Sequence, residues 1–240
     1  MAGAIANGSY ENELLIPADG VELLGILGVP PQPQGLVVFA HGSGSGRLSP
    51  RNNYVARVLQ EAGLATLLAD LLEEKESWDR RKVFDIDLLA DRLLIIARWS
   101  TTQPKISDLA LGYFGASTGA GAALQAAAQN PQQVKAVVSR GGRPDLAMPF
   151  LPRVTAPTLL IVGSNDEPVI SMNETAYAEL RCVKKLVIVP GATHLFEEPG
   201  TLEKVAQLAR DWFVTHLVTP DQARQSIRLN RVHSSYDLKG

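Results

Sequence analysis

Short runs of β-branched and aliphatic residues alternate with longer segments of helical spacing along most of this 240-residue chain. The apolar runs end at Gly, Pro, Asn or Asp, which is typical of strands bounded by turns. Strands are predicted over residues 13–17, 21–29, 36–40, 65–71, 109–114, 136–139, 158–162 and 186–189. Helices are predicted over residues 54–62, 86–99, 120–129, 173–181 and 202–218. This alternation favours βαβ crossovers, and hence an α/β fold with a mainly parallel sheet of about eight strands and helices on both faces.

Local signals refine this arrangement at three places. Asp19-Gly20 separates the first two runs and predicts a tight hairpin, so the sheet should begin with an antiparallel edge. Ser49-Pro50 predicts an N-cap followed by a proline at the first helical position. Ser171-Met-Asn-Glu174 matches a capping box and predicts the start of the helix over residues 173–181.

The domain organisation follows from length and composition. With 45% apolar residues the chain can bury one large core, so we expect a single domain over residues 1–219. The pattern ends near Val218, and residues 220–240 are expected to form a polar C-terminal tail.

Charge and cysteine content exclude several classes of function. The net charge of −2 lacks a basic stripe, so nucleic acid is not expected as a partner. Cys182 is the single cysteine, which leaves no intramolecular disulfide and no predicted metal site. The N-terminus lacks the features of a signal peptide and no apolar run is long enough to span a bilayer, so a cytoplasmic protein without membrane contact is expected. The oligomeric state is left open, with a homodimer as one option.

The pentapeptide Gly115-Ala-Ser117-Thr-Gly119 lies between a predicted strand and an Ala-rich predicted helix. This is the setting of a nucleophile elbow, in which glycines two residues before and after the serine give its strained backbone room. Ser117 is therefore the candidate nucleophile, and the backbone N–H of Thr118 would contact the oxyanion that forms on attack. The alternative is a tight strand-to-helix turn whose small residues only permit close packing.

A glycine-rich loop, His41-Gly-Ser-Gly-Ser-Gly46, follows the predicted strand 36–40. In a hydrolase with a nucleophile elbow, this loop would supply the second oxyanion N–H, from Gly42 or Ser43. A dinucleotide-binding loop is the rival interpretation, with Asp70 placed to bind a ribose. Against it, the third glycine of that fingerprint would fall on Arg47. His41 is expected to shape the loop rather than act as a base.

In hydrolases with a nucleophile elbow, an acid and then a base follow later strands, and this chain has both in that order. Asp166 comes just after the predicted strand 158–162, and His194 follows the predicted strand 186–189. We expect Asp166 to orient His194 and His194 to remove the proton of Ser117. In isolation, Asp166 would be read as a turn or helix-capping residue.

Four places in the chain resemble the dienelactone-hydrolase-like branch of the α/β-hydrolases: the loop that begins at His41, the pentapeptide around Ser117, the strand end at Asp166 and Gly191-Ala-Thr-His194. The resemblance implies the α/β-hydrolase fold and a cofactor-free mechanism, with an acyl-enzyme on Ser117 that is released by water activated at His194. Dienelactone hydrolases proper carry cysteine where this chain has Ser117, so the resemblance does not imply a dienelactone substrate.

The connection between the predicted strands 136–139 and 158–162 is too short for a substantial lid, so we expect an open pocket and a small or water-soluble substrate. Arg51 follows the glycine-rich loop 41–46, hereafter the oxyanion loop, and Arg140 follows the strand after the elbow. Both are candidate ligands for a substrate carboxylate. Surface or helix-end arginines are the alternative. The favoured function is hydrolysis of a carboxylic ester, thioester or lactone; a binding protein of the same fold that performs no catalysis and a nucleotide-binding protein are the alternatives.

Overall fold

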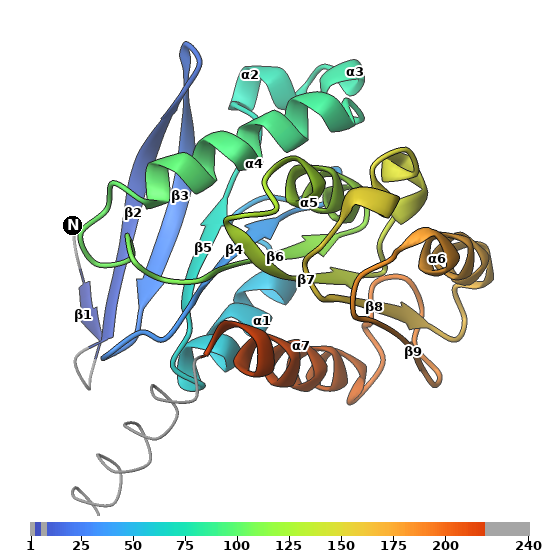
Figure 1. Cartoon of the computed structure of the whole chain (residues 1–240). Helices are drawn as coiled ribbons and strands as arrows, with labels where there is room; N and C mark the ends of the chain where they lie inside the picture. Colours follow the sequence, from blue (N-terminus) through green and yellow to red (C-terminus); the bar gives the residue numbers. More distant parts are fainter. Residues whose placement is uncertain (1–2, 6–8, 219–240) are drawn as a thin grey trace, which may run out of the picture.

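A computed structural model describes residues 3–5 and 9–218, in which one twisted sheet lies between two layers of helices (Figure 1). The strands are β1 (Gly3–Ile5), β2 (Ser9–Ala18), β3 (Val21–Val29), β4 (Leu36–Ala40), β5 (Ala65–Ala69), β6 (Leu111–Ala116), β7 (Val134–Arg140), β8 (Thr158–Gly163) and β9 (Lys184–Val189). The α-helices are α1 (Pro50–Glu61), α2 (Glu74–Ser77), α3 (Arg80–Val83), α4 (Ile86–Ser100), α5 (Thr118–Gln129), α6 (Glu167–Glu179) and α7 (Thr201–Leu217). The predicted tail, residues 220–240, lies outside the described residues.

The strand order is β1-β2-β3-β5-β4-β6-β7-β8-β9. Pairs from β1 to β5 in this order are antiparallel and all later pairs are parallel, so the expected antiparallel edge and parallel body are confirmed. Asp19 and Gly20, with φ of 44° and 84°, form the predicted hairpin turn. The described part has one strand more than the eight predicted, because β1 is three residues long and too short to show alternation in the sequence.

β4 and β6 are parallel neighbours in the sheet, and the order in which the chain adds strands reverses between them. From β4 the chain passes through α1 to β5 on one side, whereas from β6 it passes through α5 to β7 on the other. The carboxyl ends of β4 and β6 therefore flank a topological switch point, where open α/β sheets bind their ligands.

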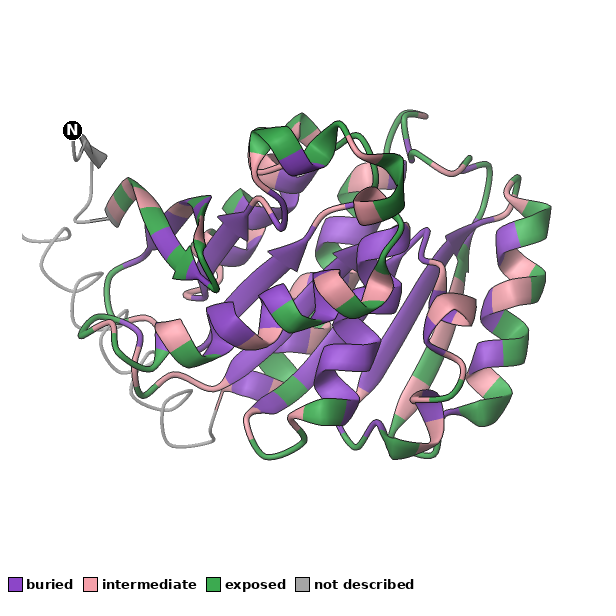
Figure 2. Cartoon of the chain, turned by 90° about the horizontal axis from the view of Figure 1, so that it is seen from above, coloured by how far each residue is buried: buried purple, intermediate pink, exposed green. Residues whose placement is uncertain are grey.

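Two apolar layers cover the sheet. One contains buried residues of α4 and α5, and the other contains buried residues of α1 and α7. Figure 2 shows α5 buried along almost its whole length. Its alanines and glycines are small enough for this helix to pack against both the sheet and α4. Close packing fixes α5, and therefore the turn that precedes it.

Helix starts agree with the sequence at one place and differ at another. Ser49 caps α1, because its hydroxyl accepts a hydrogen bond from Asn52 N at 3.4 Å. The predicted capping box at Ser171 is wrong, because α6 already begins at Glu167 and Ser171 lies inside it. Pro168 in the first turn of α6 is the helix-start signal that this interpretation missed.

Between β7 and β8 the chain forms two short 3₁₀ turns, η1 (Pro144–Ala147) and η2 (Leu151–Arg153), in agreement with the short connection predicted there. Within residues 3–5 and 9–218, no helix combines the length and apolarity needed to cross a membrane.

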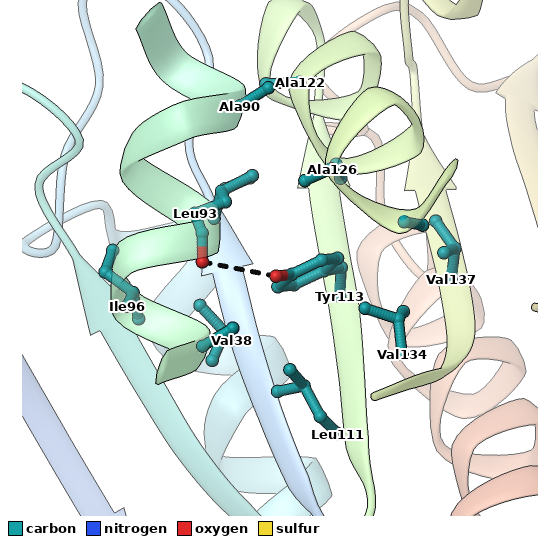
Figure 3. Close-up of a cluster of buried hydrophobic side chains, with 14 of the residues drawn as sticks. Val38, Ala90, Leu93, Ile96, Leu111, Tyr113, Ala122, Ala126, Val134 and Val137 are labelled. Atoms are coloured by element: carbon teal, nitrogen blue, oxygen red, sulfur yellow. Dashed lines mark hydrogen bonds between the residues drawn. The ribbon is translucent and has the colours of Figure 1, made fainter. Parts of the chain in front are cut away.

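Tyr113 offers a test of how tightly the core is packed. Its ring is fully buried on β6 and its hydroxyl donates to Leu93 O of α4 at 3.2 Å (Figure 3). We expect Tyr113→Phe to lower the free energy of unfolding by about 1 kcal/mol, because it removes only the hydrogen bond. Tyr113→Ala should cost about 3–5 kcal/mol because it also leaves a cavity. Urea unfolding measures both, and equal losses in the two variants would contradict this account.

Candidate active site

Ser117 lies in the sharp turn between β6 and α5 with φ 50° and ψ −123°, outside the usual regions for a residue with a side chain. Its N–H donates to Arg140 O at 3.3 Å, and its carbonyl accepts from Arg143 N at 3.0 Å. Both partners lie at or just beyond the end of β7. The strand, turn and helix predicted around Ser117 are therefore present, and its backbone is held in a strained conformation by hydrogen bonds.

Glycines surround this turn because there is no room for a side chain. A Cβ at Gly115 would lie 2.4 Å from Ala120 Cα, and one at Gly119 would lie 2.2 Å from Ala40 O. Such close packing is also what the alternative of a simple tight turn predicts. The positive φ of Ser117 is the feature that a nucleophile elbow requires in addition.

The glycine-rich loop after β4 lies directly against the elbow. A Cβ at Gly42 would be 3.0 Å from Ser117 Cβ. Ser43 N donates to Thr118 Oγ1 at 3.1 Å, which holds the loop beside the first turn of α5. Within the described residues, the N–H groups of Gly42 and Thr118 make no hydrogen bond. Thr118 N also lies at the positive end of the α5 dipole, so these amides can receive a negatively charged oxygen.

His41 supports the loop through both of its ring nitrogens. Nε2 accepts a hydrogen bond from Leu71 N at 2.9 Å, and Nδ1 therefore carries the proton that it donates to Gly42 O at 3.0 Å. Burial lowers the pKa of His41, which favours this neutral form. Since neither nitrogen is free, His41 is not placed to act as a base.

Asp70 also holds the loop. One carboxylate oxygen accepts from Arg47 N at 2.6 Å and the other from Arg47 Nη1 at 2.6 Å. Asn53 Nδ2 in turn donates to Arg47 O at 2.8 Å. The nucleotide-binding interpretation requires the Asp70 carboxylate to bind a ribose. Both of its oxygens are instead hydrogen-bonded to Arg47. Sequence reasoning missed this positioning role for Arg47 and Asp70, because 23 residues separate the partners.

Asp166 and His194 meet after β8 and β9. His194 Nδ1 donates to Asp166 Oδ2 at 2.7 Å. Asp166 occupies the N-cap position of α6, yet its side chain makes no capping hydrogen bond. Its carboxylate is therefore directed to the imidazole rather than to the helix, in contrast to the helix-capping alternative.

Three polar contacts join the two loops that carry this pair. Asn165 N donates to Ala192 O at 2.9 Å, Asn165 Nδ2 donates to Gly191 O at 3.1 Å, and Gly191 N donates to Ser164 Oγ at 2.8 Å. These contacts fix the position of one loop relative to the other. Sequence patterns gave no signal for Ser164 and Asn165, because polar residues in a turn are common for other reasons.

His194 lies close to the end of β7, where the Ser117 backbone is anchored. A Cβ at Gly141 would be 3.5 Å from His194 Nδ1, and Gly141 directly follows Arg140, whose carbonyl accepts from Ser117 N. Within the described residues, Ser117 Oγ and His194 form no hydrogen bond with each other. In unliganded enzymes such bonds are often long and shorten only in the complex with substrate.

The two predicted substrate-binding arginines are held by the protein itself. Arg51 pairs with Glu197 at 2.9 Å. Arg140 is buried, donates to Asn52 Oδ1 at 3.3 Å and lies over the Phe196 ring. Burial and the nearby charge of Arg51 lower the pKa of Arg140 to about 10. Contact of either arginine with a substrate remains a prediction.

A cavity of about 820 Å³ opens beside the oxyanion loop, and Gly42, Ser43 and Thr118 form part of its wall. Arg51 and Arg140 do not line it. Among the described residues, no group of three or more His, Cys, Asp or Glu side chains is placed to hold a metal ion.

A model of the dienelactone hydrolase family matches residues 23–215. The chain belongs to the dienelactone hydrolase family. Membership confirms the predicted α/β-hydrolase fold. The crystal structure of a dienelactone hydrolase from Anabaena variabilis ATCC 29413 is 57% identical to this chain, with a TM-score of 0.85, and the match covers 87% of this chain and 99% of that one.

Two further matches differ from this chain more strongly, one in sequence and one in length. Est1E from Butyrivibrio proteoclasticus is 19% identical with a TM-score of 0.73, covering 85% of this chain and 98% of that one, and it shows the fold alone. A Mycobacterium tuberculosis H37Rv protein, provisionally named a phosphoribosyl transferase, is 58% identical over 210 residues, which are 88% of this chain and 47% of that protein. The chain thus spans about half the length of the curated relatives it matches.

The hydrogen bonds of His41 predict a pH-dependent contribution to stability. Because burial lowers its pKa below the ordinary 6.5, the unfolded chain binds the proton first as the pH falls. The contribution is complete above pH 6.5 and decreases as the pH falls from there toward the lowered pKa. We expect the free energy of unfolding to decrease less between about pH 7.5 and about pH 5.5 in His41→Asn than in the wild type. Urea unfolding at both pH values measures this, and identical decreases would contradict it.

Proposed function

We propose that this member of the dienelactone hydrolase family is a serine hydrolase that cleaves a carboxylic ester, thioester or lactone through an acyl-enzyme on Ser117. The observation that carries the proposal is the 2.7 Å hydrogen bond from His194 Nδ1 to Asp166. This bond requires the proton to reside on Nδ1, so Nε2 is left with a lone pair that can accept a proton. The strained Ser117 turn supplies the hydroxyl at the end of β6, on the same edge of the sheet.

In the first half of the reaction, Ser117 Oγ attacks the carbonyl carbon while its proton moves to His194 Nε2. The carbonyl oxygen becomes an oxyanion, which the N–H groups of Thr118 and Gly42 would stabilise, because the N–H of Ser43 already donates to Thr118 Oγ1. The tetrahedral intermediate collapses, the bond to the leaving group breaks, and His194 returns the proton to the departing alcohol or thiol. Asp166 stabilises the imidazolium while it exists.

In the second half, His194 Nε2 removes a proton from a water molecule, which attacks the acyl carbon. The bond to Ser117 Oγ then breaks, and His194 returns the proton to the serine. The products are a carboxylic acid and free enzyme. Neither half requires a cofactor or a metal ion.

Covalent labelling tests whether Ser117 is activated. We expect a fluorophosphonate to modify the wild-type protein at Ser117, with one label per chain, and Ser117→Ala to remain unlabelled. Esterase activity should fall about 10⁴-fold or more in Ser117→Ala and about 10⁴-fold in Asp166→Asn. Mass spectrometry of the modified peptide and initial rates measure these effects.

Ser171→Ala is the matched control, because Ser171 is an exposed serine of α6, remote from the elbow in sequence. It should label and react like the wild type. Folded wild-type protein that is not labelled and hydrolyses no ester would refute the proposal in favour of a binding protein without catalytic activity.

The name of the mycobacterial relatives concerns proteins about twice as long as the matched region. The groups described above are suited to acyl transfer, and Asp70 is engaged by Arg47 rather than free for a ribose. We therefore propose that any phosphoribosyl chemistry of those relatives belongs to the part of them that this chain does not match.

Arg51 and Arg140 remain the proposed ligands for an anionic group on the substrate, on the β7 side of the elbow. If Arg140 acts in this way, Arg140→Ala should lower kcat/KM for carboxylate-bearing esters about 10-fold relative to neutral esters of the same length. Asn52→Ala, which removes the hydrogen-bond partner of Arg140, is a control for a purely structural effect. An unchanged ratio between anionic and neutral esters in Arg140→Ala would contradict this role.

A further inference from the structure

The cavity beside the oxyanion loop has properties that identify one part of the substrate, and the inference rests on the function proposed above. Thr118 and Gly42 line it together with Ser43, and the first two carry the amides proposed to hold the carbonyl oxygen. An ester bound with its carbonyl at this point must direct one of its two substituents toward the cavity. The walls of the cavity therefore select that substituent.

The volume of the cavity favours a substituent larger than an acetyl or methyl group. About 820 Å³ lies in the upper part of the range found for pockets that hold drug-sized ligands. An acetyl or methyl group would leave most of this space filled with water. The sequence predicted a small or water-soluble substrate, and of these two options a small one would fit this side of the site poorly.

Apolar side chains on the cavity wall are unusually exposed. Leu15 of β2 and Leu24 of β3 are cross-strand partners, and their side chains are 51% and 41% exposed. Leu48, just after the oxyanion loop, is 66% exposed and lines the same cavity. Exposed leucines that gather in a hollow mark a surface for an apolar ligand.

The charge around these leucines is negative. Arg47 and Asp70 neutralise each other in a 2.6 Å pair. The remaining charged side chains of the wall are Glu22, Glu73, Glu74 and Lys75, none of which forms an ion pair within the described residues. Three carboxylates thus face one ammonium group, while the lowered pKa of His41 keeps that residue neutral. An anionic ligand group would be repelled here and a cationic one attracted.

We infer that the cavity binds a bulky apolar substituent of the ester that is neutral or cationic and carries no carboxylate. Leu15, Leu24 and Leu48 contact its apolar part, and Glu22 and Glu74 disfavour an anion. Arg140 at the end of β7 and Arg51 in the first turn of α1 lie outside this cavity and would act on the other substituent. A substrate with its negative charge on the cavity side would bind poorly.

Binding of three ligands with the same octyl chain tests this inference without turnover. We expect calorimetry on the wild-type protein to give a Kd for octyl sulfate at least about five-fold weaker than those for octanol and octyltrimethylammonium. The double variant Glu22→Gln with Glu74→Gln should reduce this difference. Leu24→Trp should weaken octanol and octyltrimethylammonium binding about ten-fold, because the indole fills part of the cavity. Val183→Trp, at an exposed position outside the cavity, is the control and should leave all three Kd values unchanged.

Equal affinities for the three ligands, or Kd values unaffected by Leu24→Trp, would overturn the inference. Failure of the hydrolase proposal is recognised separately, because it appears as the absence of labelling and ester cleavage whatever the octyl ligands do. If both proposals hold, octyltrimethylammonium should inhibit hydrolysis of a neutral octanoate or octyl ester competitively, raising KM without lowering kcat.

Discussion

The strained turn at Ser117 is the constraint on which the site depends. A side-chain-bearing residue at positive φ costs about 1–3 kcal/mol, which the surrounding structure must offset. Hydrogen bonds to Arg140 O and from Arg143 N hold the turn against β7, and glycines at 115 and 119 let β4 and α5 approach it closely. The burial of α5 then fixes the direction in which the serine hydroxyl projects.

Polar contacts between loops position the side chains that the sheet brings to one edge. Parallel strands bring the residues after β4, β6, β8 and β9 to one edge, but strand order alone does not align side chains to within hydrogen-bonding distance. Arg47 and Asp70 hold the oxyanion loop, and Asn165 joins the Asp166 loop to the His194 loop. These contacts make the site a product of tertiary structure rather than of any single motif.

The sequence predicted those features that depend on local pattern and chain order. Strand periodicity, the Asp19-Gly20 turn and the order of Ser117, Asp166 and His194 all depend on neighbours in the chain, and the structure has each of them. The start of α6 was mispredicted, because Ser171 fits a capping pattern equally well inside a helix. The cavity could not be predicted, since Leu48 comes next to the cross-strand pair Leu15 and Leu24 only when the hairpin packs beside the oxyanion loop.

Chemistry and selectivity therefore come from different parts of the chain. The groups proposed to react lie at the ends of parallel strands in the body of the sheet, whereas much of the cavity wall comes from the antiparallel hairpin β2–β3 and the segment from residue 70 to residue 83. A change in the hairpin can alter the cavity without moving Ser117 or His194, because neither residue contributes to that wall. If the cavity binds one substituent of the substrate as inferred above, the side chains of the hairpin and the loop, rather than the groups proposed to react, would determine which substituent this chain accepts.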